Sequence, residues 1–289
     1  MQAARDHPPP QRDSDGPHRV SLLILATYLT VMLTPLLALV VRTRQWTPFI
    51  AHAFVLALVA LALSGRFPPW LRAWLPLLVG PFLYVELRWL IEGAGRTHTD
   101  ELMRDWERSL FPSNPSRTLA LSWPSSWVSE PLHAAYLSYY GLVYVPPALL
   151  WLKGRRRDFS LTLLALTTVY AACFVAYVLM PVDGPRFLFG PSQAPSGPFR
   201  SAALRLLEAG SSRGTAFPSS HVAASVVAAI CALRFQPRIG AVTLLLALGV
   251  AIGAVYGGFH YAVDVVAGFA AGLLCVAGTW AVERRLAAS

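Results

Sequence analysis

Two stretches interrupt an otherwise apolar sequence: Gly214-Thr215-Ala216-Phe217-Pro218-Ser219-Ser220-His221 and Tyr256-Gly257-Gly258-Phe259-His260-Tyr261-Ala262-Val263-Asp264. In the first, a proline and two serines precede an apolar run, a pattern typical of a helix N-terminus. In the second, a glycine pair separates two apolar runs, so we expect His260 and Asp264 one turn apart on one helix face. Ionisable groups at the ends of membrane-length segments are costly to bury and usually functional. These stretches therefore form the candidate site.

The chemistry of these residues favours an anionic substrate. Asp264 could accept the proton on one imidazole nitrogen of His260 and leave the other nitrogen bare as a nucleophile. Free backbone N–H groups around Ser219, Ser220 and His221 would make a nest for an oxyanion, for which a phosphate is the natural guest. Each feature also has a plain alternative, since such pairs are often structural and such serines are often only helix caps.

Composition places the chain in a membrane. Its 289 residues are 55% hydrophobic and 13% charged, with a mean hydropathy of +0.50. The net charge of +9 comes from basic residues scattered between apolar runs, which argues against a nucleic-acid partner and for loop charges that set topology. Cys173, Cys231 and Cys275 lie inside apolar segments and indicate neither a disulfide framework nor a cysteine metal site.

The sequence predicts an all-α polytopic bundle of about eight spanning helices plus one interfacial helix. Its expected parts are a disordered tail (1–19), N-terminal transmembrane helices (20–91), an interfacial loop with an amphipathic helix (92–130) and a catalytic transmembrane core (131–285). The expected spans are 20–41, 48–64, 70–91, 131–152, 160–181, 218–233, 238–256 and 261–282.

Two loops carry further expectations. Leu102, Trp106 and Leu110 share one face of a segment beginning near Asp100, as in an interfacial amphipathic helix. The basic cluster 153–157 marks its loop as cytoplasmic, which places the candidate catalytic loops on the non-cytoplasmic side of a cell or plasma membrane.

The two stretches resemble signatures of the type 2 phosphatidic acid phosphatase superfamily over roughly residues 98 to 275. Pro218-Ser219-Ser220-His221 is similar to its Pro-Ser-Gly-His signature, with Ser220 in place of the glycine. His260 precedes Asp264 by four residues, as in the third signature. The resemblance implies that His260 attacks phosphorus, Asp264 orients it and His221 protonates the leaving oxygen. It implies no metal and no cofactor.

This sequence lacks two cations that the superfamily usually carries. If Arg186 is the arginine of the first signature, Leu179 stands where the lysine is usual, and Ala254 stands where the third signature has an arginine. The expected phosphate-binding set is therefore Arg186, Ser219 and Ser220, joined by Arg213 as a second cation. An interfacial anchor for Arg186 and a solvated loop charge for Arg213 are the alternatives.

A second resemblance, to the inositol phosphorylceramide synthases and their bacterial relatives, rests on Glu107, Leu110-Phe111 and Pro115-Ser116. We therefore expect a phosphoesterase that cleaves or transfers the head group of a lipid phosphate or phosphodiester through a phosphohistidine. Water as the acceptor would make it a phosphatase, and a polyol would make it a phosphotransferase. A serine hydrolase using Ser219 or Ser220 and a non-enzymatic transporter or scaffold are the rivals. The sequence indicates neither the lipid nor the oligomeric state.

Overall fold

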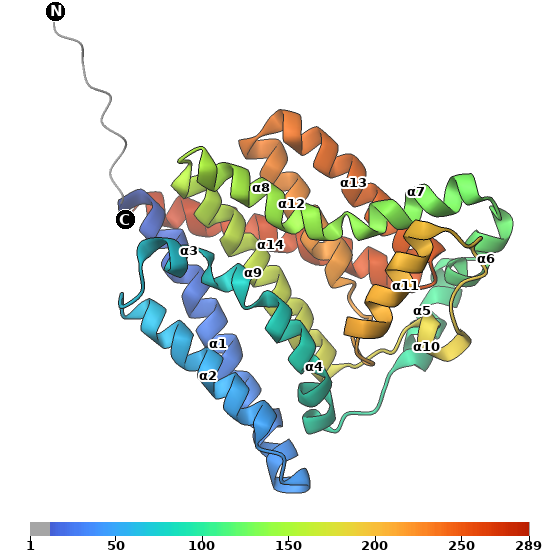
Figure 1. Cartoon of the computed structure of the whole chain (residues 1–289), viewed down its shortest axis with the longest axis horizontal. Helices are drawn as coiled ribbons and strands as arrows, with labels where there is room; N and C mark the ends of the chain where they lie inside the picture. The colour runs from blue at the N-terminus through green and yellow to red at the C-terminus, as the bar shows by residue number, and fades with distance from the viewer. Residues whose placement is uncertain (1–11, 289) are drawn as a thin grey trace, which may run out of the picture.

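The computed structural model describes residues 12–288, which form helices joined by loops and one isolated bridge between Val182 and Thr215. The all-α class expected from the sequence is confirmed (Figure 1). In chain order the helices are α1 (Arg12–Thr43), α2 (Thr47–Leu63), α3 (Pro69–Leu78), α4 (Gly80–Ala94), α5 (Asp100–Leu110), α6 (Pro115–Ser122), α7 (Ser126–Leu137), α8 (Tyr139–Leu152), α9 (Arg156–Leu179), α10 (Pro185–Phe189), α11 (Pro198–Gly210), α12 (Ser220–Phe235), α13 (Pro237–Tyr256) and α14 (Ala262–Ala288).

All eight expected spans fall on helices. Within residues 12–288, five helical segments are long and apolar enough to cross a membrane, and one of them, Pro69–Ala94, combines α3 and α4. Three shorter apolar helices, α2, α8 and α12, account for the other expected spans. The helix pairs α3/α4 and α7/α8 are each separated by a single residue, Val79 and Ser138, so each pair follows one nearly continuous path.

The N-terminal boundary corrects the sequence prediction. Helix α1 begins at Arg12 rather than near residue 20, so residues 12–19 are helical and not a disordered tail. This segment packs against the rest of the protein. A methyl group added at Gly16 would lie only 3.1 Å from Leu286 of α14, and Pro17 is buried. The rest of the predicted tail, 1–11, lies outside the described residues.

Charged helix ends gather at one end of the bundle. Glu283 of α14 pairs with Arg157 of α9 at 3.5 Å and with Arg234 of α12 at 2.8 Å. The short helices α5, α6 and α10 lie at the opposite end, on the right of Figure 1. The polar loops of the candidate site and the basic ends of the helices therefore face opposite sides of the bundle.

A buried ionisable pair ties the N-terminal helices together. Nδ1 of His52 on α2 lies 2.8 Å from Oε1 of Glu86 on α4, and its Nε2 donates to the carbonyl of Leu29 on α1 at 2.8 Å. Both side chains are buried. Because both ring nitrogens are engaged, this pair joins α1, α2 and α4 and holds the N-terminal layer in place.

Close helix packing positions the candidate site. Helix α12 packs against α9, α13 and α14. A Cβ atom at Gly268 of α14 would lie 2.4 Å from the carbonyl oxygen of Ser219, so glycine is required for this close approach. Gly258 has φ +69°, a left-handed conformation that favours glycine, in the turn between α13 and α14. The starts of α12 and α14 are thereby brought side by side.

Candidate active site

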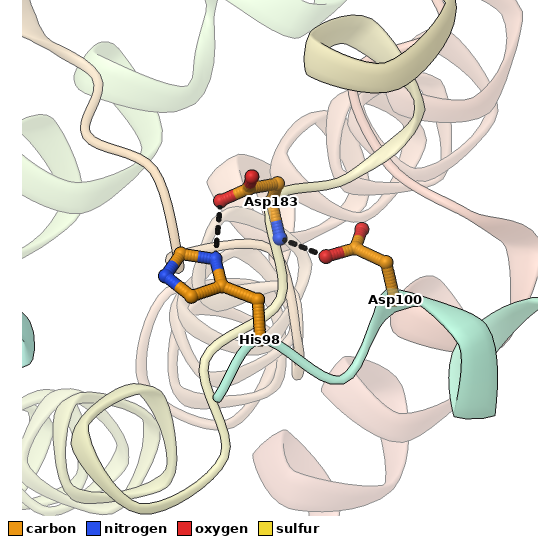
Figure 2. Close-up of side chains that lie close together, drawn as sticks. All are labelled: His98, Asp100 and Asp183. Atoms are coloured by element: carbon orange, nitrogen blue, oxygen red, sulfur yellow. Dashed lines mark hydrogen bonds and ion pairs between the residues drawn. The ribbon is translucent and has the colours of Figure 1, made fainter. Parts of the chain in front are cut away.

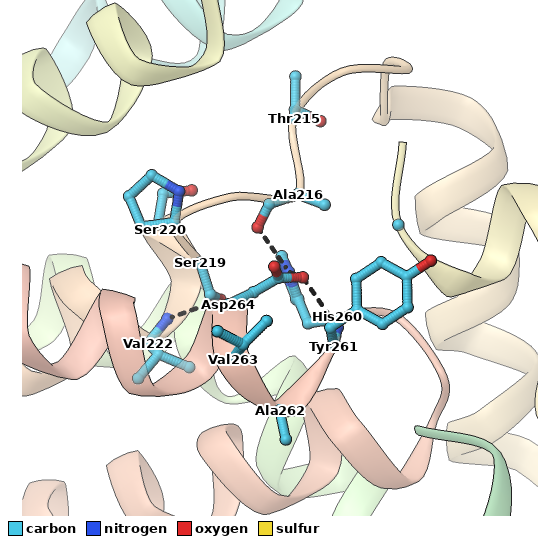
Figure 3. A network of polar contacts seen from close by, with 12 residues as sticks. Thr215, Ala216, Ser219, Ser220, Val222, His260, Tyr261, Ala262, Val263 and Asp264 are labelled. Atoms are coloured by element: carbon cyan, nitrogen blue, oxygen red, sulfur yellow. Dashed lines mark hydrogen bonds and ion pairs between the residues drawn. The ribbon is translucent and has the colours of Figure 1, made fainter. Parts of the chain in front are cut away.

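His260 lies in the turn between α13 and α14, and its hydrogen bonds define its tautomer. Nδ1 lies 3.0 Å from the carbonyl oxygen of Ala216, which can only accept, so Nδ1 carries the proton (Figure 3). Asp264 Oδ2 lies 3.5 Å from the same nitrogen. Nε2 is therefore left without a proton, as the sequence predicts. The nearest acceptor for the Nδ1 proton is the Ala216 carbonyl and not Asp264, because the two stretches pack closely together.

Asp264 is fully buried and is engaged mainly with its own turn. Its Oδ2 accepts the backbone N–H of Tyr261 at 2.8 Å, a capping contact at the start of α14. Its Oδ1 is buried with no hydrogen-bond partner among the residues described. Asp264 therefore shapes the turn that carries His260 and places a carboxylate beside the imidazole.

The pKa of His260 is lowered to about 4, mainly by burial; the Ala216 carbonyl opposes this shift and the charge of Arg186 adds to it. A group with a pKa well below 7 is unprotonated at neutral pH. The imidazole is therefore neutral, as a nucleophile requires.

His221, in the first turn of α12, faces His260 with 6.0 Å between the ring centroids. Its ring stacks on Tyr136 at 5.3 Å and contacts Tyr139 at 4.3 Å, which fixes its orientation. Both histidines line one small cavity of about 30 Å³, enough for about two water molecules. The two histidines expected from the sequence are therefore brought together around one cavity.

Arg186 of α10 lines the same cavity. Its guanidinium donates to the hydroxyl of Ser211 and lies 4.4 Å from the centroid of the Phe187 ring. Burial lowers the pKa of Arg186, which marks it as a partly desolvated cation. An arginine stays charged even so and can bind an oxyanion in two-pronged geometry.

Arg213 occupies a different position from the one expected. Its side chain is 66% exposed, and the described residues that line the cavity do not include it. Its Nη1 lies 3.4 Å from Oδ2 of Asp183, which does line the cavity. Arg213 therefore lies beside the cavity and forms an ion pair with a carboxylate that lines it.

The backbone N–H groups of Ser219 and Ser220, which the sequence predicts as part of a phosphate nest, are already hydrogen-bonded within the protein. The N–H of Ser219 donates to the carbonyl of Asp264 at 3.0 Å, and the N–H of Ser220 donates to the hydroxyl of Tyr177 at 3.1 Å. The Ser219 hydroxyl accepts from the N–H of Val222, so it caps α12. Both serines are buried, and neither is among the described residues lining the cavity. They serve the helix start, which also disfavours the serine-hydrolase alternative.

Helix α5 reaches the catalytic turn through a glutamate. The Glu107 carboxylate accepts the N–H groups of Ala262 and Val263, at 3.1 and 3.0 Å, so it caps α14 two residues after His260. Burial raises the pKa of Glu107, and these two hydrogen bonds oppose the shift. The N–H groups of Ala262 and Val263 are therefore not available to an anion. Leu102 and Trp106 are exposed on the other face of α5, consistent with an interfacial helix.

Tyr136 is a cavity residue that the sequence did not reveal. It lines the cavity, its side chain is buried, and its hydroxyl has no hydrogen-bond partner within residues 12–288. An unpaired buried hydroxyl is costly and calls for an explanation. A tyrosine inside an apolar helix gives no sequence signal for such a role, since it reads as an ordinary membrane aromatic.

One polar cluster beside the cavity could hold a cation by its geometry. Ligand atoms of His98, Asp100 and Asp183 lie within 4.8 Å of one another (Figure 2). Asp100 already accepts the N–H groups of Asp183 and Gly184, each at 2.9 Å. His98 Nδ1 lies 2.7 Å from Asp183 Oδ1, which also accepts the N–H of Gly214. The polar groups of this cluster are already hydrogen-bonded to one another and connect the loop before α5 with the loops that flank α10 and α11.

Comparison with known proteins gives one clear match. The model of the family described as the PAP2 superfamily matches residues 100–278, well over half of the chain. The matched range begins at α5 and includes both histidines, Asp264 and Arg186. Searches of characterised proteins and of solved structures found no significant match.

Proposed function

The chain belongs to the PAP2 superfamily, and on this premise we propose that it is a membrane phosphoesterase that cleaves the phosphate ester of a lipid through a phosphohistidine. The observation that carries the proposal is that His221, His260 and Arg186, from three separate segments, line one cavity. A neutral nucleophile, an acid and a cation around one space are the parts that phosphoryl transfer needs.

In the first step, Nε2 of His260 forms a bond to phosphorus as the bond from phosphorus to the lipid oxygen breaks. Near-attack geometry needs contacts of about 3–3.5 Å, which the 6.0 Å between the imidazole centroids accommodates. His221 donates its proton to the departing oxygen. The carboxylate of Asp264 stabilises the positive charge that develops on His260.

In the second step, water attacks the phosphohistidine, the bond between phosphorus and nitrogen breaks, and His221 takes the proton from the water. Free phosphate leaves, and both histidines return to their starting protonation states. In each step negative charge spreads over the phosphoryl oxygens. Arg186 and the Tyr136 hydroxyl supply donors to those oxygens, and so replace part of the charge that Leu179 and Ala254 lack.

A polyol in place of water would make the protein a phosphotransferase of the inositol phosphorylceramide synthase type. The contacts of α5 and α6 favour keeping this alternative. Glu107 caps the catalytic helix, and the carbonyl oxygen of Ser116 lies 3.5 Å from a Cβ atom built at Gly258. The segment that resembles those synthases therefore adjoins the nucleophile.

The orientation of the protein in the membrane is part of the proposal. The basic ends at Arg157 and Arg234 are taken as cytoplasmic, and the cavity then opens toward the non-cytoplasmic side. In intact cells, an impermeant maleimide should label Ser196→Cys and spare Gly154→Cys, and the reverse pattern would overturn this orientation.

The test of the function uses purified protein with a panel of lipid phosphates and phosphodiesters, with and without polyols. Free phosphate and new lipids are followed together. A phosphatase is supported if the wild type releases phosphate from at least one lipid phosphate and His260→Ala releases none. A new phosphodiester lipid formed with a polyol instead supports the transferase. Neither product from any substrate would leave the non-enzymatic alternative.

A further inference from the structure

An apolar chamber of about 230 Å³ adjoins the phosphate cavity. Its walls come from α3, α4, α8, α9 and α11, and they are mostly aliphatic side chains and tyrosine rings. The hydroxyls of two of these tyrosines, Tyr139 and Tyr170, bond to each other at 2.6 Å. Apolar rings and not polar groups therefore dominate the lining.

The chamber is continuous in its lining with the catalytic cavity at one end and with a smaller apolar cavity at the other. The smaller cavity reaches Leu25 and Tyr28 of α1. The catalytic cavity and the chamber share Tyr84, Leu207, Ser211 and His221. The chamber and the smaller cavity share Pro76, Leu77, Gly80, Tyr170 and Phe174. These shared walls place the three cavities next to one another, in order from the proposed general acid toward the N-terminal layer.

We propose that this chamber holds one hydrocarbon chain of the substrate while its phosphate lies between the histidines. The inference rests on the proposed function and names the substrate class, an amphiphilic phosphate ester. At about 230 Å³ the chamber is smaller than the range of about 300–1,000 Å³ that is typical for ligand pockets. This size favours one chain over two lying side by side.

The walls from α3 and α4 lie outside residues 100–278, the range shared with the family. The N-terminal layer of this protein therefore contributes to selection by chain length together with the catalytic core, which supplies the walls from α8, α9 and α11. The buried pair of His52 and Glu86 fixes α4 against α1 and α2, so this wall is held firmly.

Gly80 offers a direct way to shorten the chamber. It lines both apolar cavities, and a Cβ atom added there meets no atom within 4 Å. A side chain at Gly80 therefore begins in open space, and we expect Gly80→Leu to extend into the two cavities that this residue lines. Gly141 of α8 is the matched control, because a Cβ atom there also meets nothing within 4 Å, while the residue is exposed and outside the described lining of either cavity.

The experiment compares kcat/KM for ethyl phosphate and dodecyl phosphate in the wild type and the two variants. Because methylene-sized changes in an apolar pocket alter discrimination by about 10- to 200-fold, Gly80→Leu should lower the ratio of dodecyl to ethyl phosphate by at least about tenfold. Gly141→Leu should keep the wild-type ratio. Equal ratios in all three proteins would overturn the proposal.

A binding measurement separates this inference from the proposed function. A dodecyl phosphate with a photoreactive diazirine at the chain end should label α3, α4 or α9, and Gly80→Leu should abolish that labelling while Gly141→Leu keeps it. Labelling of the chamber without turnover would contradict the enzymatic function and leave the chain site standing. Turnover with labelling only outside the chamber would refute the chain site and leave the function standing.

Discussion

The Tyr136 hydroxyl gives a prediction in which stability and activity move in different directions. A buried hydroxyl without a partner costs about 1–3 kcal/mol, and Tyr136 bears this cost in the unliganded protein. Tyr136→Phe removes the hydroxyl and retains the ring that stacks on His221. We therefore expect thermal stability in detergent to stay equal to the wild type or to rise by about 1 kcal/mol.

Activity should fall in the same variant. A hydrogen bond to a charged group is worth about 1.5–3 kcal/mol, which corresponds to about 10- to 150-fold in rate. Because the charge on the phosphoryl oxygens is redistributed in the transition state, the loss should appear in kcat and not only in KM.

Tyr139→Phe is the matched control for this prediction. Tyr139 also contacts His221, but its hydroxyl is bonded to Tyr170 at 2.6 Å. Its removal leaves the Tyr170 hydroxyl unpaired, so this variant should lose about 1–3 kcal/mol of stability and keep kcat within a few fold. Melting curves and steady-state kinetics on both variants decide the matter. Wild-type kcat in Tyr136→Phe, or a clear drop in its melting temperature, would refute the assignment.

Three further predictions address the other parts of the site. Arg186→Ala should lower kcat by about 100- to 1,000-fold, as for loss of a transition-state donor, whereas Arg213→Ala, which removes an exposed ion pair, should cost at most about fivefold; equal losses in steady-state assays would contradict this division. Glu107→Ala should destabilise the protein by about 2 kcal/mol through the lost cap of α14 and lower kcat as well, and a wild-type melting temperature would count against it. Because burial lowers the pKa of His260 to about 4, the nucleophile stays neutral as the pH falls from 7 to 5. On a substrate that does not titrate in this range, kcat/KM should therefore not fall, and half-loss near pH 6.5 would disprove the shift.

The sequence predicts the fold well because membrane-length apolar runs constrain backbone structure strongly. Every expected span falls on one helix or on a pair of consecutive helices, since an unpaired backbone is too costly in lipid. The tail boundary failed because residues 12–19 are polar and give no hydropathy signal. In the structure these residues are helical, and Gly16 packs against Leu286, which lies near the other end of the sequence.

The site was predictable only where chemistry alone marks a residue. His221, His260 and Arg186 stand out as ionisable groups in apolar surroundings, and the structure brings them to one cavity. The pairing of the Ser219 N–H was not predictable, because this group donates to the carbonyl of Asp264 on α14, a contact between distant segments.

Tyr136 and Glu107 show the same limit from the other side. Tyr136 stands out because its buried hydroxyl has no hydrogen-bond partner among the residues described. Glu107 stands out because it accepts two backbone N–H groups that are 155 and 156 residues away. Tyr136 leaves no local pattern in the sequence, and the motif that contains Glu107 does not indicate its backbone partners.

The most direct test of the central claim is to identify the covalent intermediate. The purified protein is mixed with a lipid phosphate carrying radioactive phosphorus, quenched within the first turnovers and digested for mass spectrometry. We predict an acid-labile, base-stable phosphoryl group on His260, absent from His260→Ala and longer-lived in His221→Ala, which lacks the group that deprotonates the attacking water. A label that survives acid, lies on a serine or persists in His260→Ala would contradict the account.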